Sequence, residues 1–454
     1  MTFTAINPTT EAVVGKYEFH DDAYIDAALA TAHAAFLNWK TTPFAERAEL
    51  MNRVAELLES EIPVAAALMT SEMGKTFAAA KGEASKCALT MRYYAERAEG
   101  MLGEEIIKTH ASKSGIRYEP LGPLLAIMPW NFPLWQIIRV AVPNMMAGNP
   151  MVLKHSSSVP GCAQYIENLF LRAGFPQGLF TNLFVESRRI ESVIGDPRIA
   201  AVTLTGGEAA GRSVAALAGK HLKKCVLELG GSDPFIVAKS ADLDQTVPLA
   251  VTARLQNNGQ ACICAKRFIV VRDVADEFIA RFSAAMAVAP VGDPMDPSTV
   301  LGPLANEAQF NTLSKQVSES IAQGAVAATG GTPLDGPGYF FAPTVLVDVP
   351  ETAPAGNEEL FGPVAVVHVV DDLDEAIRYA NDTPWGLSGS VWATDPAEIE
   401  QVIAGLDVGI IFANAVVASM PELPFGGVKA SGYGRELGVA GVREFTNVKS
   451  FFIA

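Results

Sequence analysis

The chain has 454 residues, of which 49% are apolar and 19% are charged. This length is too great for one ordinary hydrophobic core, so two or three lobes sharing a cleft are expected. The formal net charge of −16 disfavours binding to nucleic acid or to an anionic membrane surface. The N-terminus lacks the pattern of a secretory signal, and no apolar stretch is long enough to span a bilayer. We therefore expect neither a nucleic-acid nor a membrane partner.

The five cysteines do not form a disulfide framework, because they are few, odd in number and scattered. This pattern favours a reducing cytoplasm. The close pair Cys262 and Cys264 has no second cluster of ligands at a usual spacing, so no metal site is expected.

Three Ala-rich segments, at 24–39, 44–70 and 77–99, carry apolar residues at helical spacing and predict helices. From about residue 117, short apolar runs alternate with amphipathic segments, most clearly at 124–128, 151–154 and 201–205. A second alternating region follows, with expected strands at 268–271 and 363–370. The alternation predicts parallel sheets with crossover helices. The apolar tail at 447–454 predicts a strand that needs a partner strand, from this chain or another subunit.

A polar turn, Asn-Asn-Gly-Gln at 257–260, precedes Cys262 and an apolar strand. In such a turn a thiol can be exposed and activated as a nucleophile. The alternative is that Cys262 is a small buried hydrophobic residue, as most cysteines are. This segment alone leaves both interpretations open.

Two further segments contain polar residues that suggest catalysis. Glu228 stands alone in an apolar run, and a buried carboxylate is most useful as a base with a raised pKa. A structural ion pair with a lysine such as Lys224 is the competing explanation. Asn131, in Pro-Trp-Asn-Phe-Pro at 129–133, is expected at a strand-to-helix turn, where an asparagine ordinarily caps the helix.

The motifs occur in a fixed order along the chain. They are Trp-Asn-Phe-Pro at 130–133, Glu-Leu-Gly-Gly at 228–231, Gly-Gln-x-Cys at 259–262, Glu-Leu-Phe-Gly-Pro at 359–363 and Pro-Phe-Gly-Gly at 424–427. Together they resemble the aldehyde dehydrogenase superfamily over essentially the whole chain. The segments at 153–157, 259–264 and 421–427 resemble the shorter bacterial succinate-semialdehyde dehydrogenases.

The resemblance implies an α/β protein with the aldehyde dehydrogenase-like fold. Its Rossmann-like cofactor-binding domain would comprise 1–102 and 121–229, and its α/β catalytic domain 230–430. A β oligomerisation hairpin at 103–120 would pair with the last strand, at 445–454. The segment 431–444 would return to pack on the cofactor domain. A homodimer or homotetramer is expected.

The resemblance also implies a reaction, the NAD(P)-dependent oxidation of succinate semialdehyde to succinate. Cys262 would attack the aldehyde, and Asn131 with the backbone N–H of Cys262 would form the oxyanion hole. Such donors typically contribute about 3–4 kcal/mol each. Glu228 would activate the water that hydrolyses the thioester, which disfavours transfer to coenzyme A. A broad-specificity aliphatic or aromatic aldehyde dehydrogenase, a thiol esterase and a catalytically inactive structural or binding protein are the alternatives.

The resemblance places the cofactor at a set of residues in several segments. Gly206 and Gly207 follow an expected strand and would approach the pyrophosphate, although the family usually has a serine at Gly207. NAD-preferring relatives tend to carry, at the position of Ser157, a glutamate that repels a 2′-phosphate. A serine there, beside Lys154, favours NADP and leaves NAD possible. Ser157 could instead cap the following helix. The remaining expected cofactor residues are Trp130, Glu359 and Phe361.

The substrate carboxylate is expected at Arg139. A helix beginning near Asn131 would place Trp135 and Arg139 on nearly one face, with Arg139 roughly 12 Å along the axis. A lone guanidinium in an apolar helix needs an anion, either the substrate or an internal carboxylate. Arg139 and Ser419 match carboxylate-binding positions of succinate-semialdehyde dehydrogenases, whereas Gln256 replaces a second arginine of some of them.

Cys264 lies two residues from the expected nucleophile. Some succinate-semialdehyde dehydrogenases form a reversible disulfide at this position, and a strained bond of this kind would be easily reduced. A buried, inert thiol is the alternative.

Overall fold

The computed structural model describes residues 2–454. After the hairpin of β1 (Thr2–Ile6) and β2 (Val13–Glu18), four helices follow: α1 (Asp22–Trp39), α2 (Phe44–Ser60), α3 (Ile62–Met73) and α4 (Phe77–Met101). The prediction of a single helix over 44–70 is wrong, because α2 ends at Ser60 and α3 begins at Ile62. Pro63 accounts for the break, since proline has no amide N–H and is best tolerated in the first turn of a helix.

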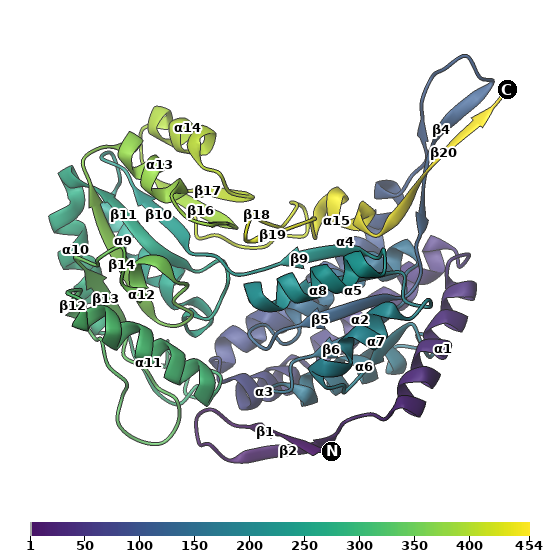
Figure 1. Ribbon diagram of the computed structural model, residues 1–454, viewed down its shortest axis with the longest axis horizontal. Helices are drawn as coiled ribbons and strands as arrows, with labels where there is room; N and C mark the ends of the chain where they lie inside the picture. Colours follow the sequence, from purple (N-terminus) through teal and green to yellow (C-terminus); the bar gives the residue numbers. More distant parts are fainter. Residues whose placement is uncertain (1) are drawn as a thin grey trace.

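The first lobe is built on a six-stranded sheet in the order β19-β9-β8-β5-β6-β7 (Figure 1). All neighbours are parallel except β19, which pairs antiparallel with β9. The strands are β5 (Leu124–Met128), β6 (Met151–His155), β7 (Phe180–Asn182), β8 (Ala201–Thr205), β9 (Lys224–Glu228) and β19 (Gly432–Tyr433). Because β5, β8 and β9 are parallel neighbours, the segments that follow them begin at the same edge of the sheet.

The helices of this lobe are α5 (Trp135–Ala147), α6 (Pro160–Arg172), α7 (Ile190–Gly195) and α8 (Glu208–Lys220). Every residue of α5 is buried, and its apolar side chains belong to the largest hydrophobic core together with those of α2, α3 and α4. A polar side chain on α5 therefore lies inside the protein and requires an internal partner or a cavity.

The second lobe contains a seven-stranded sheet in the order β12-β13-β14-β11-β10-β16-β17, in which only the β12–β13 pair is antiparallel. Its strands are β10 (Asp233–Val237), β11 (Ala265–Val271), β12 (Val326–Thr329), β13 (Thr344–Val347), β14 (Val364–Val370), β16 (Ser388–Trp392) and β17 (Ile410–Ala413). Its helices are α9 (Leu243–Leu255), α10 (Arg272–Ala287), α11 (Glu307–Ala322), α12 (Pro354–Asn357), α13 (Leu373–Asn381) and α14 (Pro396–Gly405). The short pair β15 (Trp385–Gly386) and β18 (Val428–Lys429) leads back toward the first lobe.

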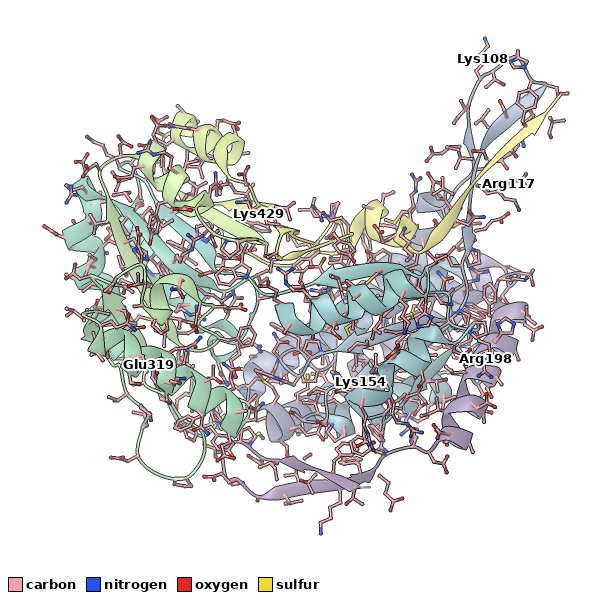
Figure 2. All side chains as sticks on the ribbon, viewed as in Figure 1. Lys108, Arg117, Lys154, Arg198, Glu319 and Lys429 are labelled. Carbon is pink, nitrogen blue, oxygen red and sulfur yellow. The ribbon has the colours of Figure 1, made fainter. Side chains whose placement is uncertain are left out.

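A three-stranded arm projects from the first lobe and carries the C-terminus (Figure 1). It consists of β3 (Glu105–Ile106), β4 (Lys113–Pro120) and β20 (Thr446–Ile453), with β20 antiparallel to β4 and preceded by α15 (Gly438–Glu444). Figure 2 shows Lys108 and Arg117 on this arm, away from both lobes. Apolar side chains of the arm are exposed as well, among them Ile106, Val448 and Phe452.

Within residues 2–454, no helix has the length and apolar character needed to cross a membrane.

Candidate active site

A cavity of about 260 Å³ is lined by residues of both lobes. The first lobe contributes the segments after β5, β8 and β9, and the second contributes the loop before β11 and the segment before β14. Many residues singled out by the sequence motifs therefore line one cavity: Trp130, Asn131, Gly206, Gly207, Glu228, Cys262, Glu359 and Phe361. A thiol, an amide and a carboxylate thus meet beside a glycine-lined strand-to-helix turn.

The loop before Cys262 has an unusual backbone. Asn257, Asn258 and Gly259 have φ values of 53°, 58° and 72°, in the left-handed region where asparagine and glycine are most readily accepted. A side chain at Gly259 would place its Cβ 2.4 Å from the carbonyl carbon of Gly362. The Asn-Asn-Gly sequence is therefore required by this turn, which passes close to the segment before β14.

Buried amides fix this loop against the first lobe. The Asn257 side chain donates to the carbonyl of Asn131 at 2.8 Å and to that of Gln260 at 3.0 Å. Asn258 donates to the carbonyl of Gly74 at 2.9 Å. The nucleophile loop is thereby held in register with the Asn131 turn.

Burial raises the pKa of the Cys262 thiol to about 12, although the nearby charges of Arg139 and Lys266 lower it. The Lys266 ammonium donates to the carbonyl of Cys262 at 2.7 Å and so lies beside the nucleophile. At neutral pH the thiol is protonated in this structure, and its attack requires a base or an added positive charge.

Asn131 is not a helix cap. Its amide nitrogen donates to the carbonyl of Gln260 at 2.9 Å, and its amide oxygen accepts from Gln136 at 3.0 Å. The prediction of a helix start near Asn131 is wrong, because α5 begins at Trp135. One amide hydrogen of Asn131 remains available for an oxygen bound in the cavity.

The sequence motifs missed the residue that holds the start of α5. One carboxylate oxygen of Glu83, on α4, accepts the backbone N–H groups of both Leu134 and Trp135 at 2.8 Å. Glu83 also forms a buried ion pair with Lys75. No local signal marked Glu83, because its contacts are about fifty residues away in sequence.

Glu228 is 2% exposed, and neither of its carboxylate oxygens has a hydrogen-bond partner among the residues described. Burial and the neighbouring Glu436 raise its pKa well above the usual value, while Arg139 and Arg435 act in the opposite direction. The alternative pairing with Lys224 is not observed, because that lysine pairs with Glu444 at 3.1 Å. Such an unpaired carboxylate can accept a proton at neutral pH.

The motif glycines make room for carboxylates. A Cβ at Gly426, where φ is +153°, would lie 2.6 Å from an oxygen of Glu228. A Cβ at Gly230 would lie 2.2 Å from an oxygen of Glu359. Glu359 accepts from the N–H of Gly231 at 3.2 Å and pairs with Lys266 at 3.1 Å, which fixes it at the cavity wall.

The segment after β8 fits a dinucleotide phosphate. Gly207 is the N-cap residue of α8, and no side chain caps this helix end. A Cβ at Gly207 would meet no atom within 4 Å, so the space in front of the helix is open. Helix N-termini of this kind bind phosphate through free N–H groups. Trp130 and Phe361 meet edge to face at 5.7 Å between ring centroids and form another part of the cavity wall.

Lys154 and Ser157 line a separate cavity of about 170 Å³. Figure 2 shows Lys154 in the first lobe, on β6. Glu186 also lines this cavity, but it is paired with Arg188 at 2.8 Å. Ser157 does not cap α6, whose N-cap residue is Val159. A lysine and a free hydroxyl beside a neutralised carboxylate suit a ribose phosphate.

Arg139, expected at the substrate carboxylate, has an internal carboxylate partner. Its Nε forms an ion pair with Glu436, and both side chains are 2% exposed. Its Nη2 lies 3.4 Å from the hydroxyl of Thr205, and the guanidinium stacks 4.3 Å from the centroid of the Phe425 ring. Arg139 thus has the internal carboxylate that the sequence left as the alternative.

The other two expected substrate residues contact each other. The indole N–H of Trp135 donates to the hydroxyl of Ser419 at 3.0 Å. Gln256 does not line the main cavity; together with Trp135 it lines another cavity, of about 200 Å³.

Cys262 and Cys264 are both free thiols. Cys264 is fully buried, and its thiol lies 3.4 Å from the carbonyl of Gln256, which it can reach as a donor. Cys264 therefore has the burial that the inert alternative requires.

A sequence model of the aldehyde dehydrogenase family matches residues 1–451. The chain belongs to the aldehyde dehydrogenase family. It is 52% identical to a succinate-semialdehyde dehydrogenase [NADP(+)] of Mycobacterium tuberculosis, with each sequence covered completely. The aldehyde dehydrogenase resemblance and the α/β fold class are thereby confirmed.

Solved structures of the family superpose closely. A succinic semialdehyde dehydrogenase from Streptococcus pyogenes in complex with NADP+ is 38% identical over 99% of each chain, with a TM-score of 0.97. The lactaldehyde dehydrogenase of Escherichia coli, 31% identical over 100% of this chain and 96% of its own, has a TM-score of 0.96. Because family members with different substrates share the fold, the substrate must be argued from the site.

Proposed function

We propose that this family member oxidises succinate semialdehyde to succinate with NADP as the hydride acceptor. The observation that carries the chemistry is the single cavity in which Cys262, Asn131 and the unpaired Glu228 meet. The full-length likeness to NADP-dependent succinate-semialdehyde dehydrogenases supports the choice of substrate and cofactor.

The reaction has two stages, acylation of Cys262 and hydrolysis of the resulting thioester. The thiol of Cys262 loses its proton to a base and its sulfur bonds to the aldehyde carbon, which leaves an oxyanion. The amide of Asn131 and the backbone N–H of Cys262 donate to that oxygen. After hydride loss yields a thioester, Glu228 takes a proton from water, and the resulting hydroxide releases the acid and regenerates the thiol.

NADP, when bound, accepts the hydride. We assign its pyrophosphate to the N-terminus of α8 at Gly206 and Gly207, and its 2′-phosphate to Lys154 and Ser157. The carboxylate of Glu359 is held by Lys266 at 3.1 Å and lines the main cavity, where it can accept from the nicotinamide ribose. NAD lacks the 2′-phosphate and would use fewer of these contacts.

Two variants test the chemistry. Cys262→Ala should abolish NADPH formation, whereas Glu228→Gln should permit acylation and slow hydrolysis, so that a pre-steady-state burst precedes a slow steady state. Stopped-flow absorbance with succinate semialdehyde measures both. Sustained turnover by Cys262→Ala would exclude the thioester route.

An aldehyde dehydrogenase of broad specificity is the second candidate function. The internal pairing of Arg139 with Glu436 favours it, because the guanidinium expected to select a carboxylate is engaged. Comparable kcat/KM values for succinate semialdehyde and butanal would support this second function.

We further propose that the arm pairs with a second copy of the chain in a homo-oligomer. The exposed apolar residues of the arm support this, and they include Ile106, Val448, Phe452 and Ile453. We also propose a reducing cytoplasm as the location, because all five cysteines are free thiols. Val448→Asp should reduce the mass measured by size-exclusion chromatography with light scattering. An unchanged mass would place the subunit contact elsewhere.

A further inference from the structure

Lys266 is a buried lysine close to the nucleophile. It lies near the start of β11 and is 1% exposed. Ala265 and Arg267 pair with residues of β10 that are consecutive in sequence, so Lys266, between them, is the extra residue of a β-bulge. A bulge changes the direction of a side chain, and the ammonium of Lys266 is directed at the loop that carries Cys262.

The ammonium of Lys266 has three acceptors. It donates to the carbonyl of Ala261 at 3.1 Å and to that of Cys262 at 2.7 Å. Its third partner is the carboxylate of Glu359, at 3.1 Å, which lines the main cavity. Because an ammonium has three hydrogens, these contacts satisfy it and fix its position. Lys266 thus connects the nucleophile loop with the carboxylate that we assign to the nicotinamide ribose.

These contacts hold the peptide that contains the N–H of Cys262. That N–H and the carbonyl of Ala261 belong to one planar trans peptide, in which they point in opposite directions. The carbonyl is held by Lys266 and by the N–H of Cys264 at 3.1 Å. The N–H of Cys262 is therefore directed away from Lys266. Among residues 2–454 no backbone carbonyl accepts from it, which leaves it available to an oxygen of a bound aldehyde.

The charge of Lys266 acts on the thiol as well. Burial raises the pKa of the Cys262 thiol to about 12. The positive charges of Arg139 and Lys266 lower that pKa, whereas the negative charges of Asp233 and Glu359 raise it. The effect of Lys266 is larger than that of Glu359. The two partners of one ion pair thus act on the same sulfur in opposite directions.

We propose that Lys266 is a positioning residue that prepares Cys262 for attack. Its ammonium orients the peptide between Ala261 and Cys262 so that the N–H faces the aldehyde oxygen, and its positive charge favours the attacking thiolate. Lys266 gains and loses no proton in this role, and the thiol proton still passes to a base. The inference rests on the proposed function, in which the N–H of Cys262 is an oxyanion donor.

The first experiment examines the thiol without aldehyde or cofactor. The full chain is alkylated with iodoacetamide at mildly alkaline pH, and the rate at Cys262 is followed by mass spectrometry of its peptide. Lys266→Met should lower this rate about threefold or more, because a tenfold smaller thiolate fraction is partly offset by a thiolate that is about threefold more nucleophilic. Glu359→Gln should raise the rate, since it removes a negative charge that disfavours the thiolate.

Three further variants serve as controls. Lys239→Met removes an exposed lysine that pairs with Asp273 at 2.7 Å, and it should react as the wild type does. Lys266→Arg keeps the charge and should keep most of the rate. If Lys266→Met does not fold, Lys266→Met/Glu359→Gln removes both charges of the buried pair, and its rate should still lie below that of the wild type.

The second experiment tests the orientation of the peptide. At saturating NADP, Lys266→Met should lower kcat/KM for succinate semialdehyde by about tenfold or more, because loss of a whole oxyanion donor costs about 100- to 1000-fold. The factor should be similar for butanal, since every aldehyde forms the same oxyanion. Lys266→Gln can still donate to a carbonyl without carrying a charge. It should recover part of kcat/KM and none of the alkylation rate.

The outcomes separate the parts of the inference. An alkylation rate unchanged in Lys266→Met, or changed in the same direction in Lys266→Met and Glu359→Gln, overturns the role of the charge. An unchanged kcat/KM in Lys266→Met overturns the role in orienting the oxyanion donor. Failure of the proposed function is seen separately, as sustained turnover by Cys262→Ala, because alkylation of the free chain requires neither aldehyde nor NADP.

Discussion

The buried pair of Arg139 and Glu436 permits a quantitative test of whether the guanidinium is structural. Both side chains are 2% exposed, so solvent screens their charges little. Arg139→Met would leave the carboxylate of Glu436 buried without its cation, close to that of Glu228. Removing one partner of such a pair costs about 3–5 kcal/mol, whereas replacing both by apolar residues of similar volume is often neutral or stabilising.

We therefore expect Arg139→Met to lower the melting temperature by several degrees and Arg139→Met/Glu436→Leu to recover most of the loss. Arg139→Met should also reduce kcat/KM for succinate semialdehyde and butanal by similar factors, because the guanidinium lowers the pKa of Glu228 for every substrate. Differential scanning fluorimetry and steady-state assays measure these effects. A variant as stable as the wild type that loses activity only toward succinate semialdehyde would refute the reasoning and return Arg139 to the substrate site.

Four further predictions follow from other contacts. Ser157→Glu should shift the NADP-to-NAD ratio of kcat/KM toward NAD by about tenfold or more, because it places a negative charge against the 2′-phosphate; an unchanged ratio would place that phosphate elsewhere. Gly426→Ala should lower stability by about 1–3 kcal/mol and slow hydrolysis, whereas Gly219→Ala, with no atom within 4 Å of its Cβ, should be neutral in a denaturation assay. Because the pKa of Glu228 is raised, the rate of thioester hydrolysis, measured by quenched flow, should fall as the pH drops through that pKa. A rate of hydrolysis that does not change with pH would exclude Glu228 as the base. Peroxide inactivation should be reversed by dithiothreitol in the wild type and not in Cys264→Ala, and equal recovery in both would exclude a disulfide between the neighbouring thiols.

The sequence predicted the location of the catalytic residues better than it predicted their partners. Asn131 follows β5 and Glu228 ends β9, and parallel strand order brings such positions to one edge of a sheet. The alternation of strands and helices predicted parallel sheets but not this strand order, and only the family resemblance linked the two residues in advance. The turn at 257–259 could also be anticipated, since asparagine and glycine accept its positive φ values.

Partners distant in sequence could not be predicted in this way. Glu436 is 297 residues from Arg139, and Ser419 is 284 residues from Trp135. Neither contact follows from periodicity, because each depends on how the return segment from the second lobe packs on the first. The lone guanidinium of α5 stands out in its apolar helix, but the sequence does not show which carboxylate it meets.

The active site therefore combines one uncompensated charge with many compensated ones. Glu228 is buried without a hydrogen bond, which is costly for a carboxylate and raises its pKa. Glu436, which lies close to it, and Glu359, in the same cavity wall, are each paired with a cation. Because these carboxylates already have cationic partners, Glu228 is left as the unpaired carboxylate that the proposed base role requires.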